Sequence, residues 1–249
     1  MTNFFLSKAQ FLIAAHVFRN ELPLQRETGV VSFCFDDAPR SSCVVGRQIL
    51  ESMDCHGTWY IAGGLTDRME QGRLCHSVSD VQDLANSGHH IGCHTFSHKR
   101  CATLTGDEME DELKRNADFF ESIGLPSTGL DFSFPLGSFD IASKRIAARY
   151  FRSSRIIGGG IQVGSADMNA LKSLSLYQHS MSPERTTVLM KEVALRRGWL
   201  MLYTHDIEDS PSRWGCTSGL LTFAVQAALD VGCKVMSVDE AIQYWSNRA

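Results

Sequence analysis

Short apolar segments rich in β-forming residues alternate with segments of helical period along most of the chain. The strand candidates cover residues 30–35, 57–62, 89–93, 129–134, 151–157, 171–177, 199–203 and 233–238. The helix candidates cover residues 41–53, 79–88, 105–123, 140–149, 183–197, 217–231 and 239–245. Strands joined by helical crossovers run parallel. Seven or eight such units in 249 residues predict an α/β fold, a distorted (β/α)7-8 barrel, with a single doubly wound sheet as the alternative.

The N-terminal segment has its own pattern. Its apolar residues follow helical spacing between Phe4 and Phe18, which predicts an amphipathic helix. We therefore expect residues 1–28 to form a helical extension packed on a single domain of residues 29–249. The apolar run at 11–18 is far shorter than the ~20 residues of a membrane span. No small-residue cleavage site follows it, so we expect no signal peptide and a cytoplasmic protein.

The composition indicates which kinds of partner and which cellular compartment to expect. A formal charge of -4 provides no overall basic field, which argues against nucleic acid as a partner. The 8 cysteines contain no Cys-x-x-Cys pair, and several lie in apolar strand candidates. This usage favours free core thiols in a reducing compartment over disulfides.

Carboxylates and imidazoles collect where predicted strands end. Asp36 and Asp37 follow the first barrel strand, His94 and His98 the third, and His205 the strand at 199–203. Alone, the Asp pair is also an ordinary cap or turn signal, and a His-x-x-x-His pair is common on solvated helices. Because a barrel gathers its strand ends on one face, two histidines and one carboxylate can bind one metal there. Such a set leaves positions open for water and substrate.

The order of these motifs resembles that of the NodB-type polysaccharide deacetylases, carbohydrate esterase family 4. Cys34-Phe-Asp-Asp-Ala38 resembles the family's Thr-Phe-Asp-Asp-Gly, and Ser87-Gly-His-His-Ile-Gly-Cys-His-Thr-Phe-Ser-His98 is similar to its Gly-His-Glu-Ile-Gly-Asn-His-Thr-x-x-His. Pro135-Leu-Gly137 resembles the family's Pro-Tyr-Gly, and Leu202-Tyr-Thr-His205 its Leu-x-His. The resemblance covers residues 29 to 245 and implies the NodB-type barrel.

The resemblance implies roles for the residues at the strand ends. Asp37, His94 and His98 would hold one divalent metal ion, zinc in most of the family, with iron or cobalt as alternatives. Asp36 would be the general base that deprotonates the attacking water. His205 would be the acid that protonates the departing amine.

The resemblance also implies a substrate site for an N-acetylated sugar. The backbone N–H of Leu136 would stabilise the oxyanion, and Pro135 beside it would contact the substrate. Trp214 lies in a turn-rich stretch soon after His205, which suits a loop that stacks on a sugar or closes the cleft. An ordinary turn with Trp214 packed on the barrel is the alternative.

The sequence departs from the family pattern at the third motif. The family carries an arginine two residues before the motif's proline, where it helps to orient the catalytic aspartate; this chain has Ser133. Arg152 and Arg155 on the following strand are candidates to replace it, Arg155 in particular, although a strand-end arginine is often only an ion-pair partner. The Asp and Trp of the fourth motif have no counterpart, which leaves the environment of His205 open.

These residues predict a metal-dependent carbohydrate N-deacetylase, a hydrolase of C–N bonds other than peptide bonds. We expect its substrate to be an intracellular polysaccharide precursor, such as a nucleotide- or lipid-linked sugar for surface polysaccharide or O-antigen. A hydrolase of cyclic amides or ureides with the same fold is the first alternative. A catalytically silent relative that only binds glycan is the second.

Overall fold

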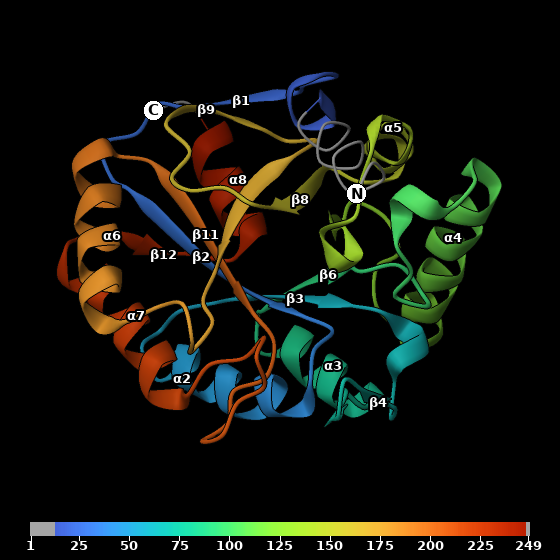
Figure 1. The fold of residues 1–249 in the computed structure, drawn as a ribbon, viewed down its shortest axis with the longest axis horizontal. Coiled ribbons are helices and arrows are strands. Elements are labelled where there is room, and N and C mark those ends of the chain that lie inside the picture. The colour runs from blue at the N-terminus through green and yellow to red at the C-terminus, as the bar shows by residue number, and fades with distance from the viewer. Residues whose placement is uncertain (1–12, 248–249) are drawn as a thin grey trace, which may run out of the picture.

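The protein is a closed barrel of seven parallel strands, which Figure 1 shows as a central group of strands with helices around it. The computed structural model describes residues 13–247. The strands follow the order β2-β3-β6-β7-β8-β10-β11, and β11 pairs back onto β2 from Trp199↔Val30 to Thr204↔Phe35. This closure confirms the predicted barrel and excludes the open doubly wound sheet.

The strands of the barrel are short. They are β2 (Val30–Asp36), β3 (Thr58–Ile61), β6 (His90–Cys93), β7 (Asp131–Ser133), β8 (Ser153–Ile157), β10 (Leu171–Ser175) and β11 (Trp199–Thr204). The helices around them are α2 (Arg47–Glu51), α3 (Val78–Asn86), α4 (Gly106–Ser122), α5 (Ile141–Tyr150), α6 (Pro183–Arg196), α7 (Ser218–Asp230) and α8 (Val238–Ser246). The last predicted strand is reduced to β12 (Lys234–Val235), which pairs with the start of β2 outside the ring.

Strand β2 shows how the barrel directs its side chains. Successive side chains of a strand point to opposite faces. Val31 and Phe33 belong to the cluster that includes core residues of α3, α4, α6 and α7, whereas Val30 and Cys34 belong to a second cluster with side chains from β3, β10, β11 and α8. Asp36 continues the series of Val30 and Cys34. It therefore points into the barrel at its carboxyl end.

Helix termini follow local capping chemistry. The capping box predicted at Thr105 is present, because Thr105 accepts from the Glu108 N–H and the Glu108 carboxylate accepts from the Thr105 N–H. Helix α3 begins two residues earlier than predicted. Its cap is Ser77, paired with Asp80, and not Ser79. The reciprocal Ser-x-x-Asp pattern decides the start, since it satisfies two backbone donors at once.

The N-terminal extension contains a strand that the sequence pattern did not indicate. Residues 13–16 are helical, while the rest of the predicted helix, residues 1–12, lies outside the described residues. Strand β1 (Glu21–Leu24) pairs antiparallel with β9 (Gly164–Asp167). Strand β1 is only four residues long and contains Pro23, and β9 consists of Gly-Ser-Ala-Asp, so the pairing of the two depends on tertiary contacts. The buried Lys144 ammonium joins the layers by donating to the Ala14 and Val17 carbonyls, at 3.0 and 2.8 Å, and to Asp167 at 2.8 Å.

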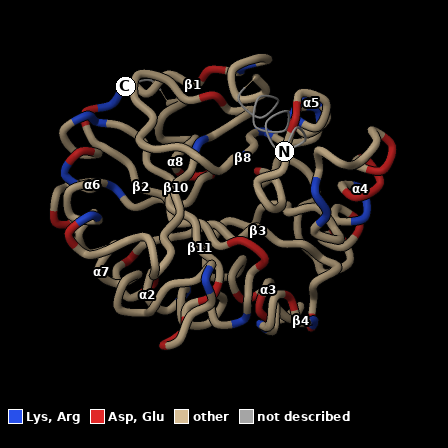
Figure 2. The backbone as a smooth tube through the Cα atoms, in the orientation of Figure 1, with Lys and Arg blue, Asp and Glu red and all other residues tan. Residues whose placement is uncertain are grey.

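Charge and cysteine usage follow the expectations from composition. Figure 2 shows acidic and basic residues interspersed on the outer helices α4 and α6. All eight cysteines are buried free thiols, as predicted. Trp59 and Trp199 are fully buried in the core. Within residues 13–247, no helix combines the length and apolarity needed to span a membrane.

Candidate active site

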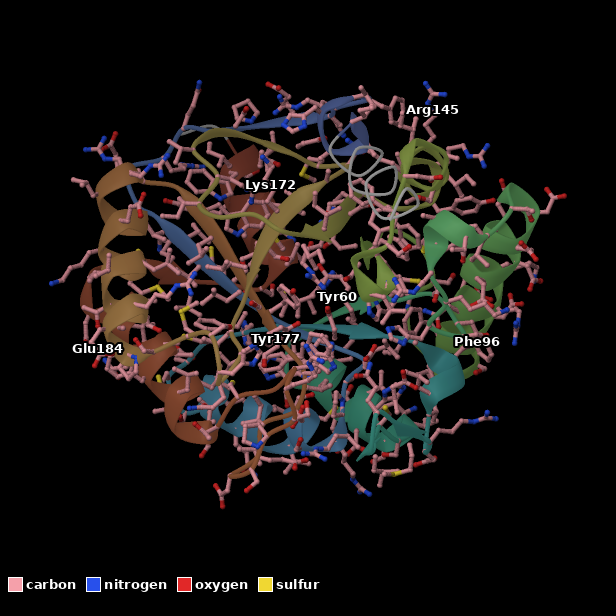
Figure 3. All side chains as sticks on the ribbon, viewed as in Figure 1. Tyr60, Phe96, Arg145, Lys172, Tyr177 and Glu184 are labelled. Carbon is pink, nitrogen blue, oxygen red and sulfur yellow. The ribbon has the colours of Figure 1, made fainter. Side chains whose placement is uncertain are left out.

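The carboxyl ends of the barrel strands surround one cavity of about 210 Å³. Its wall carries residues from eight separate segments of the chain: Asp36, Gln71, His94, His98, Arg100, Leu136, Gly137, Ile157, Tyr177, Tyr203, His205 and Trp214. Figure 3 shows Tyr60 and Tyr177 near the centre of the view, inside the ring of helices, with Glu184 and Phe96 toward opposite sides. Most residues that the sequence analysis singled out therefore lie in or beside a single cavity.

Asp37, His94 and His98 form a buried cluster suited to a metal ion. Their candidate ligand atoms all lie within 4.8 Å of one another. The Nε2 atoms of His98 and His94 lie 3.0 and 3.5 Å from Asp37 Oδ1. That oxygen is buried and accepts no hydrogen bond from the described residues. Residues 94–98 form a loop rather than a helix, with positive φ angles of 60° at Thr95 and 53° at His98.

Both histidines of the cluster are anchored through Nδ1. His94 Nδ1 donates to the Ser133 carbonyl at 2.7 Å, and His98 Nδ1 faces Glu70 Oε1 at 3.3 Å. This leaves each Nε2 lone pair directed at Asp37. Burial lowers the pKa of His94 to about 3, which keeps the imidazole neutral as a metal ligand must be. Burial raises the pKa of Asp37 to about 7, an arrangement that a bound cation would reverse.

Asp36 is held by Arg155. One Nη of Arg155 donates to Asp36 Oδ1 at 2.6 Å and to the Ser133 hydroxyl at 2.5 Å, and the other donates to Ser173 at 2.7 Å. Arg155 is 1% exposed. Burial acts to raise the pKa of Asp36, but the Arg155 charge, with His94 and His205, brings that pKa below its ordinary value. Asp36 is therefore a carboxylate under ordinary conditions.

The arginine lies on a different strand from the one that the family motif uses. Ser133 on β7 and Arg155 on β8 are direct partners in the parallel register, so their side chains leave the same face at the same level. The guanidinium reaches Asp36 from one strand further along. The other candidate, Arg152, directly precedes β8 at its amino end and pairs with Asp131 and Asp239 instead.

His205 stands across the cavity from Asp36. Its Nε2 lies 3.8 Å from Asp37 Oδ2, and its Nδ1 donates to the Trp214 carbonyl at 3.1 Å. The tautomer is thereby fixed by a backbone oxygen. The Tyr177 ring lies beside both the imidazole and the indole. Its centroid is 6.0 Å from that of the His205 ring and 5.6 Å from that of the Trp214 ring. Trp214 thus lines the cavity and positions the histidine.

The third motif presents backbone to the cavity. Leu136 has a left-handed conformation, φ 57° and ψ 18°, and lines the cavity together with Gly137. Its N–H donates to no described residue. Pro135 is buried, and the cavity wall at this point is formed by Leu136 and Gly137.

Three residues near the site were not singled out from the sequence. Glu70 and Gln71 come from a two-stranded hairpin, β4 (Met69–Glu70) and β5 (Arg73–Leu74). Gln71-Gly72 between the two strands was an available turn signal. Asp206 is 1% exposed and accepts from the N–H and hydroxyl of Ser212, at 2.7 and 2.5 Å. Its position directly after His205, at the end of the predicted strand 199–203, was the available sequence signal.

Fold and site together define a barrel hydrolase with a candidate metal centre at the carboxyl ends of its strands. The sequence profile described as polysaccharide deacetylase matches residues 24–150, and the chain belongs to this family. No curated protein sequence matches the chain.

Solved structures similar to this one share the barrel at low sequence identity. A putative polysaccharide deacetylase from Mycobacterium smegmatis aligns with a TM-score of 0.64 and 15% identity, over 89% of this chain and 92% of that one. The chitin deacetylase of Colletotrichum lindemuthianum aligns with a TM-score of 0.61 and 14% identity, over 86% of this chain and 87% of that one. A CE4 family pseudoenzyme from Bacillus anthracis aligns with a TM-score of 0.54 and 15% identity, over 86% of this chain and 66% of that one. At these identities the likeness concerns the fold.

Proposed function

We propose that this protein is a metal-dependent carbohydrate N-deacetylase that removes an acetyl group from an amino sugar. The observation that supports it most is the Asp37–His94–His98 cluster, placed between the Arg155-bound Asp36 and His205. Family membership supports the general activity, and the cavity geometry supports the assignment of individual residues.

The cluster fits a divalent cation. Asp37 Oδ1 is buried without a hydrogen-bond partner among the described residues, and both histidines are anchored with Nε2 toward it. Two imidazoles and one carboxylate are a donor set that zinc accepts, and iron and cobalt are compatible with it. Once bound there, the ion would supply Lewis acidity and lower the pKa of water to roughly 7.

The chain's own residues would then divide the proton transfers. Asp36 accepts a proton from the attacking water, and Arg155 keeps Asp36 ionised and oriented for this role. The Leu136 N–H donates to the amide oxygen as negative charge develops on it. His205 acts as the acid in its doubly protonated form: Nδ1–H stays on the Trp214 carbonyl, and the proton on Nε2 goes to the leaving nitrogen. The C–N bond breaks, a C–O bond forms, and the products are acetate and an amino sugar.

The cavity favours a small substrate unit. At about 210 Å³ it is smaller than the roughly 300–1,000 Å³ of pockets for drug-sized ligands, which suits a single sugar ring. The Tyr177 and Trp214 rings offer apolar faces for such a ring. We extend the proposal to a cytoplasmic protein that acts on a nucleotide- or lipid-linked polysaccharide precursor. The eight buried free thiols are compatible with a reducing compartment.

Metal content and two variants test the proposal. Purified protein should contain about one divalent ion per chain. Asp36→Asn should retain the ion and lose turnover, whereas His94→Ala should lose the ion. Absence of metal together with no gain of hydrolysis on adding zinc or cobalt would contradict the proposal.

A substrate screen separates the alternatives. Acetate release from N-acetylated sugars supports the deacetylase, and ring opening of cyclic amides or ureides supports the other hydrolase. Glycan binding without any turnover would identify a silent relative, for which the serine at position 133 is the specific argument. The Arg155–Asp36 contact favours the active enzyme over that reading.

A further inference from the structure

The β4–β5 hairpin brings a carboxylate to one of the two histidines of the metal cluster. Glu70 Oε1 lies 3.3 Å from Nδ1 of His98, and the His98 and Glu70 side chains are 6% and 30% exposed. Glu70 is distant in sequence from His98. Nothing in the motifs of the chain assigns Glu70 a role.

The two histidines are therefore anchored by different partners. His94 donates from Nδ1 to the Ser133 carbonyl, whereas Nδ1 of His98 lies 3.3 Å from a carboxylate oxygen of Glu70. A carboxylate that accepts from one imidazole nitrogen fixes the tautomer and orients the ring. It also makes the other nitrogen a better donor to a metal ion.

The hairpin is fixed by contacts between Arg73 and the loop that follows His205. Its turn residues Gln71 and Gly72 have φ angles of 48° and 81°. Arg73, which follows them, lies 3.3 Å from Asp206 and 3.2 Å from Glu208, and donates to the Ser210 carbonyl at 3.1 Å. The position of Glu70 is thus set by contacts with the loop that follows His205, independently of His98.

We propose that Glu70 is a positioning residue that holds His98 in the orientation and tautomer needed to bind the metal ion. The inference rests on the proposed function, because it presupposes that the Asp37–His94–His98 cluster binds a metal. Glu70 acts through His98 and touches neither substrate nor the reacting atoms.

The test is metal affinity of the full-length protein, measured for zinc by competition with a chromophoric chelator. Glu70→Gln preserves the shape of the side chain and removes its charge, and should weaken zinc binding about 10–100-fold, the usual cost of losing such a partner. Without metal, Glu70→Gln should unfold at the same temperature as the metal-free wild type, because the hairpin lies at the surface. Glu70→Asp keeps the carboxylate and should bind more tightly than Glu70→Gln.

Asp209→Asn is the control. It removes an exposed carboxylate from the loop that follows His205, and among the described residues Asp209 forms no ion pair with Arg73 or with a histidine of the cluster. Its zinc affinity should equal that of the wild type.

The outcomes separate this inference from the proposed function. If the wild type binds no zinc, the proposed function itself fails. If the wild type and Glu70→Gln bind zinc equally, or if Asp209→Asn weakens binding as much as Glu70→Gln does, the role of Glu70 is overturned while the metal site stands. An equal loss in Glu70→Asp and Glu70→Gln would show that the carboxylate is not what matters, which also overturns it.

Discussion

At the scale of single residues, the position of one buried guanidinium determines the state of Asp36. Arg155 is packed between the rings of Tyr60 and Tyr203, at 5.2 and 4.7 Å from their centroids, and donates to Asp36. A buried charge without such a partner is costly, so the pair holds its geometry firmly. Because Ser133 is the register partner of Arg155, the family's arginine has in effect moved to the neighbouring strand.

An exchange between these two positions tests that interpretation. Arg155→Ser should lower kcat at least about 100-fold, because Asp36 loses its orienting charge and general-base catalysis contributes roughly 10²–10⁴-fold. The double variant Ser133→Arg/Arg155→Ser should recover about tenfold or more, since a hydrogen bond to a charged group is worth about 1.5–3 kcal/mol. The measurement is acetate release under saturating substrate.

Metal content supplies the control for this exchange. Arg155 contacts none of Asp37, His94 or His98 by hydrogen bond, so both variants should retain the metal of the wild type. If the double variant retains its metal and its fold but recovers no activity, an arginine on β7 cannot replace Arg155 on β8, and the interpretation is contradicted.

At the scale of elements, the loop between β11 and α7 shapes the acid side of the site. Asp206 accepts from Ser212 and lies 3.3 Å from Arg73, which joins this loop to the β4–β5 hairpin. The loop returns so that the Trp214 carbonyl accepts from both the backbone N–H and Nδ1 of His205. The loop thus fixes the histidine and the indole that lines the cavity.

Asp206→Asn should loosen that loop. The variant keeps the volume but removes the charge that faces Arg73, so we expect a loss of several-fold to about 100-fold in kcat/KM. Stability should fall by about 1–3 kcal/mol, the cost of losing a hydrogen-bond partner of a buried polar group, because Asp206 is buried whereas Arg73 is 28% exposed. Steady-state kinetics and urea unfolding are the measurements. Asp209→Asn, at an exposed position of the same loop, should change neither; equal effects of the two variants would contradict the assigned role.

At the scale of the whole molecule, the two ends of the barrel have different functions. The amino ends carry a buried network around Asp131, which accepts from Arg152 at 2.7 Å and Ser153 at 2.8 Å and lies 2.9 Å from His90. In barrels, the face opposite the active site contributes stability. Burial acts to raise the pKa of Asp131, but His90 and Arg152 bring it below its ordinary value.

This network predicts a specific dependence of stability on pH. A carboxylate whose pKa is lower in the folded protein stabilises it fully above its unfolded pKa of about 3.9, and loses that contribution as the pH falls through the folded value. Asp131→Asn should therefore cost about 3–5 kcal/mol at pH 7. The difference between wild type and variant should shrink below pH 4. Urea unfolding at several pH values measures it, and a difference that is constant down to pH 3 would refute the assignment.

Local patterns anticipated the elements more accurately than their boundaries and pairings. Thr105 and Glu108 were recognised as a capping box because all its atoms lie within four residues. Strands β1 and β9 were missed because Pro23 and Gly164 are poor strand residues, and only the pairing of two distant segments makes them strands.

The sequence by itself determined the alternation of strands and helices, and with it parallel strands whose ends bear Asp36, Asp37, His94, His98 and His205. Those features are local, since periodicity and strand ends can be recognised within a few residues. Only the tertiary structure decided that Arg155 reaches Asp36, that Glu70 reaches His98, and that the Trp214 carbonyl anchors His205. Each of these contacts joins segments from different strands or loops, and its geometry depends on the register and closure of the barrel, which no single stretch of sequence encodes.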